Sequence, residues 1–151
     1  MIIHKSMDDL QVGDSACFSK TVTETDALMY VGATGDFSPI HVDEQYSQGT
    51  RFGHRIAPGI MVAGMITAVL GNDLVGCDPI SVGDEFRFKA PIYYGDTITA
   101  EMRIVEKIPE KRVLKLEATC TNQNDVVVLT AKAVMVFPKP VPAPSTGGGQ
   151  A

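Results

Sequence analysis

The sequence has little of what several classes of protein require. Its three cysteines, Cys17, Cys77 and Cys120, are far apart and show no CxxC spacing, so it predicts neither a disulfide framework nor a zinc site. We expect buried free thiols instead. No block of basic residues offsets the formal net charge of -5. This argues against a nucleic-acid partner, because binding phosphates requires clustered lysine and arginine.

Long apolar runs are also missing. The longest run falls well short of the roughly 20 residues needed to cross a bilayer. The N-terminus, MIIHKSMDDL, turns acidic too early for a signal peptide. The sequence therefore predicts a cytoplasmic protein with no membrane partner. Its 151 residues, 44% of them hydrophobic, suit one globular domain.

The second half of the chain, after about residues 76–79, has the periodicity of β-strands. Apolar and polar side chains alternate over two segments joined by the short link IPEK, which indicates a hairpin. A later segment, 126–137, is apolar on both faces, which predicts a central strand covered on each side. We expect about five strands in an antiparallel sheet, at residues 15–22, 80–89, 97–104, 114–120 and 126–137.

The first half contains two predicted helices. Thr23 or Thr25 can cap one that runs through about Ala33. The other begins at Pro58, a residue favoured at the first helical position, and runs to a stop at Gly71. Because it is apolar on every side, we expect the protein to surround it. The simplest arrangement wraps the sheet around this helix, which is an α+β architecture.

The segment GDFSPIH, residues 35–41, is the main candidate for chemistry. Its Gly35 and Pro39 suit neither a helix nor the middle of a strand, so we expect a shaped, irregular backbone. Asp36 and His41 could jointly hold a water molecule and act as general acid and base. Such a pair could add water across an activated double bond or remove it. Either residue could instead be structural, since Asp followed by Ser and Pro is a common turn.

The start of the apolar helix supplies a second candidate. The first amides of a helix lack internal partners, so the Gly59 amide could bind an oxygen on which negative charge develops. Pro58 and Gly59 could equally do no more than begin the helix. The hydroxyl of Thr67 could border a substrate pocket or bond back to a carbonyl one turn earlier.

The run YVGATGDFSPIHVDEQYSQGTRFGHRIAPGIMVAGMITAVLG resembles the (R)-specific enoyl-CoA hydratases of the MaoC-like hot-dog family. That family's signature is D-x-N/S-P-x-H, followed by a glycine at the start of the central helix. FRFKAPIYYGDTI resembles its second strand pair. The resemblance covers residues 12–137 and implies a hot-dog fold, an antiparallel sheet wrapped around one long buried helix. We assign this domain to residues 1–137 and expect the Pro/Gly-rich tail, residues 138–151, to be disordered.

The resemblance also implies an activity. The family hydrates trans-2-enoyl-CoA and, in reverse, dehydrates 3-hydroxyacyl-CoA, without metal or redox cofactor. Asp36 and His41 would activate the water, and the Gly59 amide would bind the thioester carbonyl. The implied partners are the acyl-CoA and further copies of the chain, as a homodimer or a dimer of dimers. The remaining pocket residues would be Ser38, Pro39, Thr67 and Leu70, with Leu70 as a bulky floor that favours short acyl chains.

The sequence departs from the family pattern at three positions. Pro58 replaces a frequent histidine, Ser38 a common asparagine and Thr67 a serine. Two other functions stay open: a hot-dog thioesterase and a noncatalytic acyl-thioester binding subunit. The apolar helix offers no carboxylate to activate water for hydrolysis. The cations that could meet coenzyme A phosphates, or simply be solvated, are His54, Arg55, Arg87 and Lys89.

Overall fold

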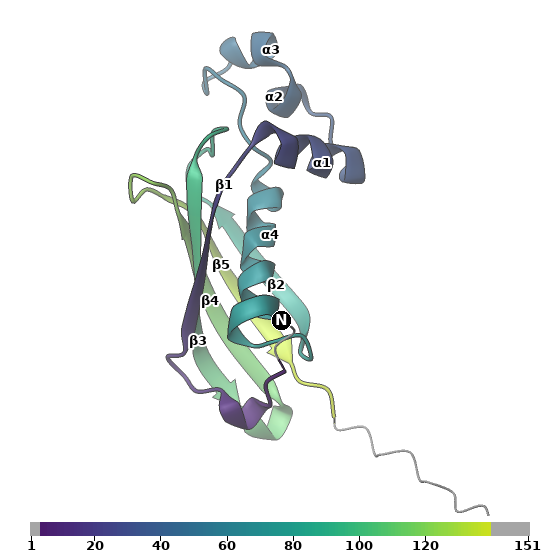
Figure 1. The fold of residues 1–151 in the computed structure, drawn as a ribbon, viewed down its shortest axis with the longest axis vertical. Coiled ribbons are helices and arrows are strands. Elements are labelled where there is room, and N and C mark those ends of the chain that lie inside the picture. Colours follow the sequence, from purple (N-terminus) through teal and green to yellow (C-terminus); the bar gives the residue numbers. More distant parts are fainter. Residues whose placement is uncertain (1–3, 140–151) are drawn as a thin grey trace, which may run out of the picture.

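A five-stranded antiparallel sheet curves behind one central helix in the computed structural model, which describes residues 4–139 (Figure 1). The strand order is β1-β3-β4-β5-β2. This arrangement confirms the predicted α+β architecture. The strands are β1 (Ser15–Thr21), β2 (Ile80–Phe88), β3 (Thr97–Ile108), β4 (Val113–Thr121) and β5 (Val127–Val136). The helices are η1 (Met7–Asp9), α1 (Glu24–Thr34), α2 (Pro39–Val42), α3 (Glu44–Gln48), α4 (Gly59–Val69), η2 (Leu70–Leu74) and η3 (Pro109–Lys111).

Strands β3 and β4 form the predicted hairpin, closed by η3 and by Arg112 in the left-handed region at φ 56°. Their alternation buries one face of each strand and exposes the other, as expected for a sheet covered on one side. The buried side chains are Ile98, Ala100, Met102, Ile104, Leu114, Leu116, Ala118 and Cys120.

Strand β5 lies between β4 and β2, so its backbone is paired on both edges. Its two faces differ, however. Leu129, Ala131 and Ala133 are buried, whereas Lys132 on the other face is exposed. The prediction of a strand covered on each side is therefore wrong, because α4 covers only the inner face of the sheet.

Helix α4 begins at Gly59, with Pro58 as its N-cap, one residue later than predicted. The helical path does not stop at Gly71. It continues through the π-turn η2, where the amides of Val75 and Gly76 both donate to the carbonyl of Leu70, at 3.0 and 3.2 Å. Gly76, at φ 84°, is the left-handed residue that ends it.

The sides of α4 differ in how deeply they are buried. Val62, Ile66 and Val69 are buried against the sheet, but Ile60 is 51% exposed and Thr67 is exposed as well. The expectation that protein surrounds the helix is thus wrong within the described part of this chain. The curved sheet covers one side and leaves uncovered a stripe formed by Ile60, Gly64 and Thr67.

The three helices α1, α2 and α3 lie together beyond the N-terminal end of α4 (Figure 1). Thr23, not Thr25, caps α1. Its hydroxyl accepts from the Asp26 amide at 3.2 Å, and the Asp26 carboxylate accepts from the Thr23 amide at 2.9 Å. This capping box fixes the entry into α1, which ends at Gly35 and leads into the candidate segment.

Two of the three cysteines are not where we expected them. Cys120 is buried on the inner face of β4, but Cys17 on the edge strand β1 and Cys77 in the loop after η2 are exposed. Among residues 4–139 no helix is long and apolar enough to cross a membrane. The predicted disordered tail lies outside the described residues except for Pro138 and Lys139.

Candidate active site

The predicted irregular backbone is right for residues 35–38 but wrong from Pro39, where the short helix α2 begins, because proline is favoured at the first helical position. Gly35, at φ 77°, ends α1 in the left-handed region. Asp36 then closes a tight turn, since its Oδ1 accepts from the Ser38 amide at 3.3 Å. Pro39 begins the one-turn helix α2, which carries His41. A turn and a short helix thus bring the two candidate side chains to the same place.

The imidazole of His41 is oriented by the main chain. Its Nδ1 lies 2.8 Å from the carbonyl oxygen of Ile56. A carbonyl only accepts hydrogen bonds, so Nδ1 carries the hydrogen, and in the neutral ring Nε2 keeps its lone pair. The side chain is 13% exposed. The ring is therefore held with a basic nitrogen available for a proton.

The Nε2 atom of His41 faces the carboxylate of Asp36, with 3.9 Å between Nε2 and Oδ2. This distance is too long for a direct hydrogen bond. With neutral imidazole both atoms are acceptors, and a water molecule has two O–H groups to give. The carboxylate is 43% exposed, so water reaches the pair. The arrangement suits the activation of one water molecule.

A pocket of about 330 Å³ lies beside His41, and Asp36 is not among its lining residues. His41 of α2 and Gly59 at the start of α4 both line it. Its size lies at the lower end of the range for small-molecule sites, and most of its lining is apolar. The other lining residues are Arg51, Phe52, Ile56, Ala57, Ile60, Phe88, Lys89, Ala90, Pro91 and Ile92.

Gly59 is the first residue of α4, so its amide has no partner within the helix. The ring of Phe88 packs closely over it. A Cβ at position 59 would lie 2.6 Å from Cε1 and 2.8 Å from Cδ1 of Phe88. Carbon atoms normally approach to about 3.5–4.0 Å. Only glycine therefore fits between the pocket and this ring.

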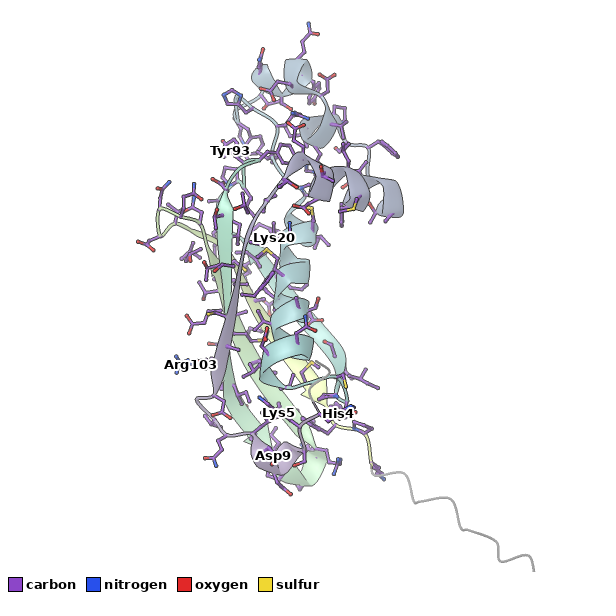
Figure 2. The ribbon with its side chains drawn as sticks, viewed as in Figure 1. His4, Lys5, Asp9, Lys20, Tyr93 and Arg103 are labelled. Carbon is purple, nitrogen blue, oxygen red and sulfur yellow. The ribbon has the colours of Figure 1, made fainter. Side chains whose placement is uncertain are left out.

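Hydrogen bonds from the connection between β2 and β3 hold α2 and the loop that contains Ile56. The Tyr94 hydroxyl donates to the His41 carbonyl at 2.8 Å, and burial raises the pKa of Tyr94 so that the hydroxyl stays protonated. The Tyr93 hydroxyl donates to the Phe52 carbonyl at 3.1 Å. Figure 2 shows Tyr93 at the end of the molecule that carries α1 to α3. Asp96, which is 9% exposed, accepts from the Tyr93 amide at 2.8 Å.

Several of the predicted phosphate-binding cations are paired with carboxylates. Arg55 contacts Glu24 at 2.5 Å and Glu44 at 3.3 Å, and His54 contacts Glu44 at 2.7 Å. Burial lowers the pKa of Arg55, but the hydrogen bond and charge of Glu24 outweigh it and raise that pKa overall. These ion pairs connect α1, α3 and the loop.

Two cations do line the pocket, Arg51 and Lys89. Arg51 lies over the Phe52 ring, 4.7 Å from its centroid. By contrast, Arg87 pairs with Glu85 at 2.5 Å and lines a separate groove on the sheet. Sequence reasoning missed Arg51, Phe88, Tyr94 and the Ile56 carbonyl, because none of them belongs to the GDFSPIH segment.

The remaining predicted pocket residues lie elsewhere. Ser38 is the residue before α2 and makes no capping hydrogen bond, and Pro39 begins the helix that carries His41. Thr67 donates to the Gly64 carbonyl at 2.7 Å, the structural alternative considered above, and Leu70 is buried at the start of η2. None of these four lines the pocket around Gly59. Their part in substrate binding stays a prediction.

A family model for the MaoC like domain matches residues 11–128. The chain belongs to the MaoC-like family. An (R)-specific enoyl-CoA hydratase of Rhodospirillum rubrum is 40% identical over 136 residues, which cover 90% of this chain and 94% of the relative. A 3-hydroxybutyryl-CoA dehydratase of Methylorubrum extorquens is 36% identical over 148 residues, 95% of this chain and 94% of the relative.

Solved structures agree with this assignment. The unliganded R-hydratase PhaJ1 of Pseudomonas aeruginosa has a TM-score of 0.82 at 29% identity, with 89% of this chain and 86% of that chain covered. The (R)-hydratase of A. caviae has the same score and identity, with 85% and 98% covered. These MaoC-like relatives confirm the predicted hot-dog fold and the predicted class, the enoyl-CoA hydratases and dehydratases, which are hydro-lyases.

Proposed function

We propose that this chain adds water reversibly to trans-2-enoyl thioesters of coenzyme A, forming the (R)-3-hydroxyacyl product. Asp36 and His41 are the proposed acid/base pair, and the Gly59 amide is the proposed site for the thioester oxygen. The observation that supports this most is the 2.8 Å contact between His41 Nδ1 and the Ile56 carbonyl. It leaves Nε2 free as a base opposite Asp36.

In the proposed reaction, water donates one O–H to Asp36 and the other to His41 Nε2. The water oxygen attacks C3 of the enoyl group while Nε2 takes a proton. Electron density moves to the thioester oxygen, where the Gly59 amide and the positive end of the α4 dipole stabilise the negative charge. The imidazolium then returns a proton to C2. One hydroxyl and one hydrogen have been added, and the reverse sequence removes water.

The pocket also offers cations for the coenzyme A part of the substrate. Arg51 and Lys89 line the pocket, and their charges suit the phosphates of coenzyme A. In this scheme side chains and one amide carry every step. The expectation that the reaction uses no metal or redox cofactor stays a prediction.

We expect a short acyl chain. The pocket holds only about 330 Å³, and a relative 36% identical to this chain is named for the four-carbon substrate 3-hydroxybutyryl-CoA. Leu70 does not line this pocket, so the predicted floor there adds nothing to the size argument. Turnover of four-carbon and eight-carbon trans-2-enoyl-CoA should therefore favour the shorter substrate. Preference for the longer one would contradict the size argument.

We also propose that two copies of the chain associate through β2 and the uncovered stripe of α4. Strand β2 is an edge of the sheet and exposes Ile80 and Val82 by 63% and 61%. An unpaired edge with apolar side chains favours pairing with another strand. Light scattering should give a dimer or a dimer of dimers for the wild type and smaller particles for Val82→Lys. A monomeric wild type would refute this. The cytoplasmic location stays a prediction.

Trans-2-butenoyl-CoA distinguishes the proposed activity from the two alternatives. Hydration removes the absorbance of the conjugated thioester, hydrolysis releases free thiol, and a binding subunit causes neither change. Asp36→Asn and His41→Ala should each lower kcat by about 10²- to 10⁴-fold and leave the melting temperature near that of the wild type. Full hydratase activity in both variants would exclude the proposed pair. The configuration of the product tests the (R) assignment.

A further inference from the structure

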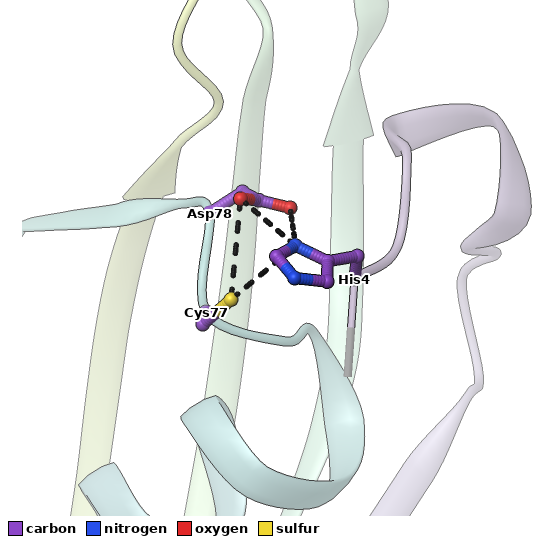
Figure 3. A group of neighbouring side chains, drawn as sticks. All are labelled: His4, Cys77 and Asp78. Atoms are coloured by element: carbon purple, nitrogen blue, oxygen red, sulfur yellow. Dashed lines mark hydrogen bonds and ion pairs between the residues drawn. The ribbon is translucent and has the colours of Figure 1, made fainter. Parts of the chain in front are cut away.

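A second cluster of chemically active side chains lies at the other end of the molecule. His4 comes before η1, and Cys77 and Asp78 lie in the loop between η2 and β2 (Figure 3). We call these three residues the distal cluster. Figure 2 shows His4 at the end of the molecule opposite Tyr93, so the distal cluster is remote from the His41 pocket. The proposed hydration uses none of its residues.

The backbone around the distal cluster is anchored independently of it. The ammonium group of Lys5 donates to the Leu74 carbonyl at 2.7 Å and to the Asp73 carbonyl at 3.3 Å. These carbonyls lie at the end of η2, where cations are favoured. Lys5 therefore holds the N-terminal segment against the loop, and His4 is placed beside Cys77 and Asp78 without needing any contact of its own.

The donor atoms of the cluster converge. His4 Nδ1 lies 3.5 Å from Cys77 Sγ and 3.1 and 3.3 Å from the two carboxylate oxygens of Asp78. Cys77 Sγ lies 3.9 Å from Asp78 Oδ1. In a tetrahedral zinc site with bonds of about 2.0–2.1 Å to nitrogen and oxygen and 2.3 Å to sulfur, the ligands are about 3.3–3.6 Å apart. The cluster is close to these separations.

An ion pair between His4 and Asp78, with 3.1 Å between Nδ1 and Oδ2, accounts for two of the three side chains. The thiol and the carboxylate both approach the same ring nitrogen, Nδ1. A histidine that activates a nucleophile uses its two ring nitrogens for its two partners, so this is not a catalytic Cys-His-Asp arrangement. A cation accounts for three donors turned toward one point. We propose that the distal cluster binds a divalent metal of the zinc type through His4, Cys77 and Asp78.

Nitrogen, thiolate and carboxylate together are a ligand set typical of zinc, and cobalt(II) takes the same geometry. All three residues are exposed, so water completes the coordination. Such a site would connect the N-terminal segment to the loop after η2 and close the C-terminal end of the central helix. We expect it to stabilise the fold without taking part in hydration.

Cobalt(II) titration of the reduced chain, without an added histidine tag, tests the proposal. A thiolate-to-cobalt absorption in the near ultraviolet should appear, saturate at one equivalent and disappear on addition of zinc. It should be lost in Cys77→Ser and kept in Cys17→Ser, the matched control for an exposed thiol. A missing band in the wild type, or a band that survives in Cys77→Ser, would overturn the proposal.

Thermal unfolding gives a second measurement that does not depend on thiolate absorption. Free zinc at about a hundred times the dissociation constant should raise Tm by roughly 5–10 °C. His4→Gln should abolish this rise, whereas His54→Gln, at the exposed histidine paired with Glu44, should retain it. Equal zinc responses in both variants would show adventitious surface binding and refute the site. Hydratase activity should be the same with and without zinc.

Discussion

Gly59→Ala probes the junction between the proposed oxyanion site and the edge strand. The added Cβ would lie 2.6 Å from Cε1 of Phe88, about 1 Å closer than an ordinary carbon contact. The ring must therefore move, or the start of α4 must. Either change alters the space in front of the Gly59 amide, and the new methyl group also covers that amide. The loss of one oxyanion donor typically lowers kcat by about 10²- to 10³-fold.

The stability cost should be smaller than the catalytic cost. Phe88 is 52% exposed on the edge strand, so its ring can turn toward solvent and relieve most of the overlap. We expect the variant to lose about 1 kcal/mol of unfolding free energy, the lower end of the range for overpacking. Urea unfolding measures this loss, and steady-state hydration of trans-2-butenoyl-CoA measures the rate.

Two further variants make the test of Gly59 decisive. Gly71→Ala adds a methyl group in η2, with nothing within 4 Å, and should keep wild-type activity. Gly59→Ala combined with Phe88→Ala removes the ring. Recovery of activity would assign the defect to the displaced ring, and persistent loss would assign it to the methyl group over the amide. Wild-type kcat/KM in Gly59→Ala alone would refute the role of the helix start.

Three other predictions concern the supports of the site and the fold. Tyr94→Phe removes the 2.8 Å hydrogen bond to the His41 carbonyl. It should lower the free energy of unfolding in urea by about 1 kcal/mol and lower kcat more than it changes KM. An unchanged kcat would show that Tyr94 does not support the site. Hydrogen bonds from Lys20 and Thr23 lower the pKa of Asp26 from 3.8 to about 2. The stabilisation that comes from this lowered pKa is complete above the unfolded pKa and is lost as the pH falls toward 2. The urea midpoint of Asp26→Asn should therefore fall less than that of the wild type between about pH 5 and about pH 2.5, and parallel declines would contradict the assignment. Burial raises the pKa of Cys120 to about 11. A thiol reagent near neutral pH should therefore modify Cys17 and Cys77 in the folded protein and Cys120 only after denaturation. Rapid reaction of all three would show an open core.

The parts of this protein that local pattern determines were predictable. Alternation over residues 97–104 and 114–120 identified two strands and their buried faces. The start of α1 was predicted at Thr23 or Thr25, and the capping box with Asp26 in the structure decides for Thr23. The closeness of Asp36 and His41 was also predictable, because the turn and the short helix that bring them together lie in the same seven-residue segment.

Features that depend on tertiary contacts were not predictable in this way. Gly71 looked like a helix stop, but the Leu70 carbonyl accepts two amides and η2 carries the chain onward. The closeness of Phe88 to Gly59 joins an edge strand to the start of a helix. The expected burial of every side of α4 failed because helix periodicity reports apolar surface and not what covers it.

The acceptor that orients His41 is a main-chain oxygen, that of Ile56, and every amino acid would supply the same atom. No single side-chain replacement at position 56 deletes it. Natural variation can therefore alter the imidazole tautomer only by shifting the loop as a whole, for example by lengthening it. Among homologous sequences, insertions between His41 and Gly59 should accompany changes in pH optimum more often than substitutions there do.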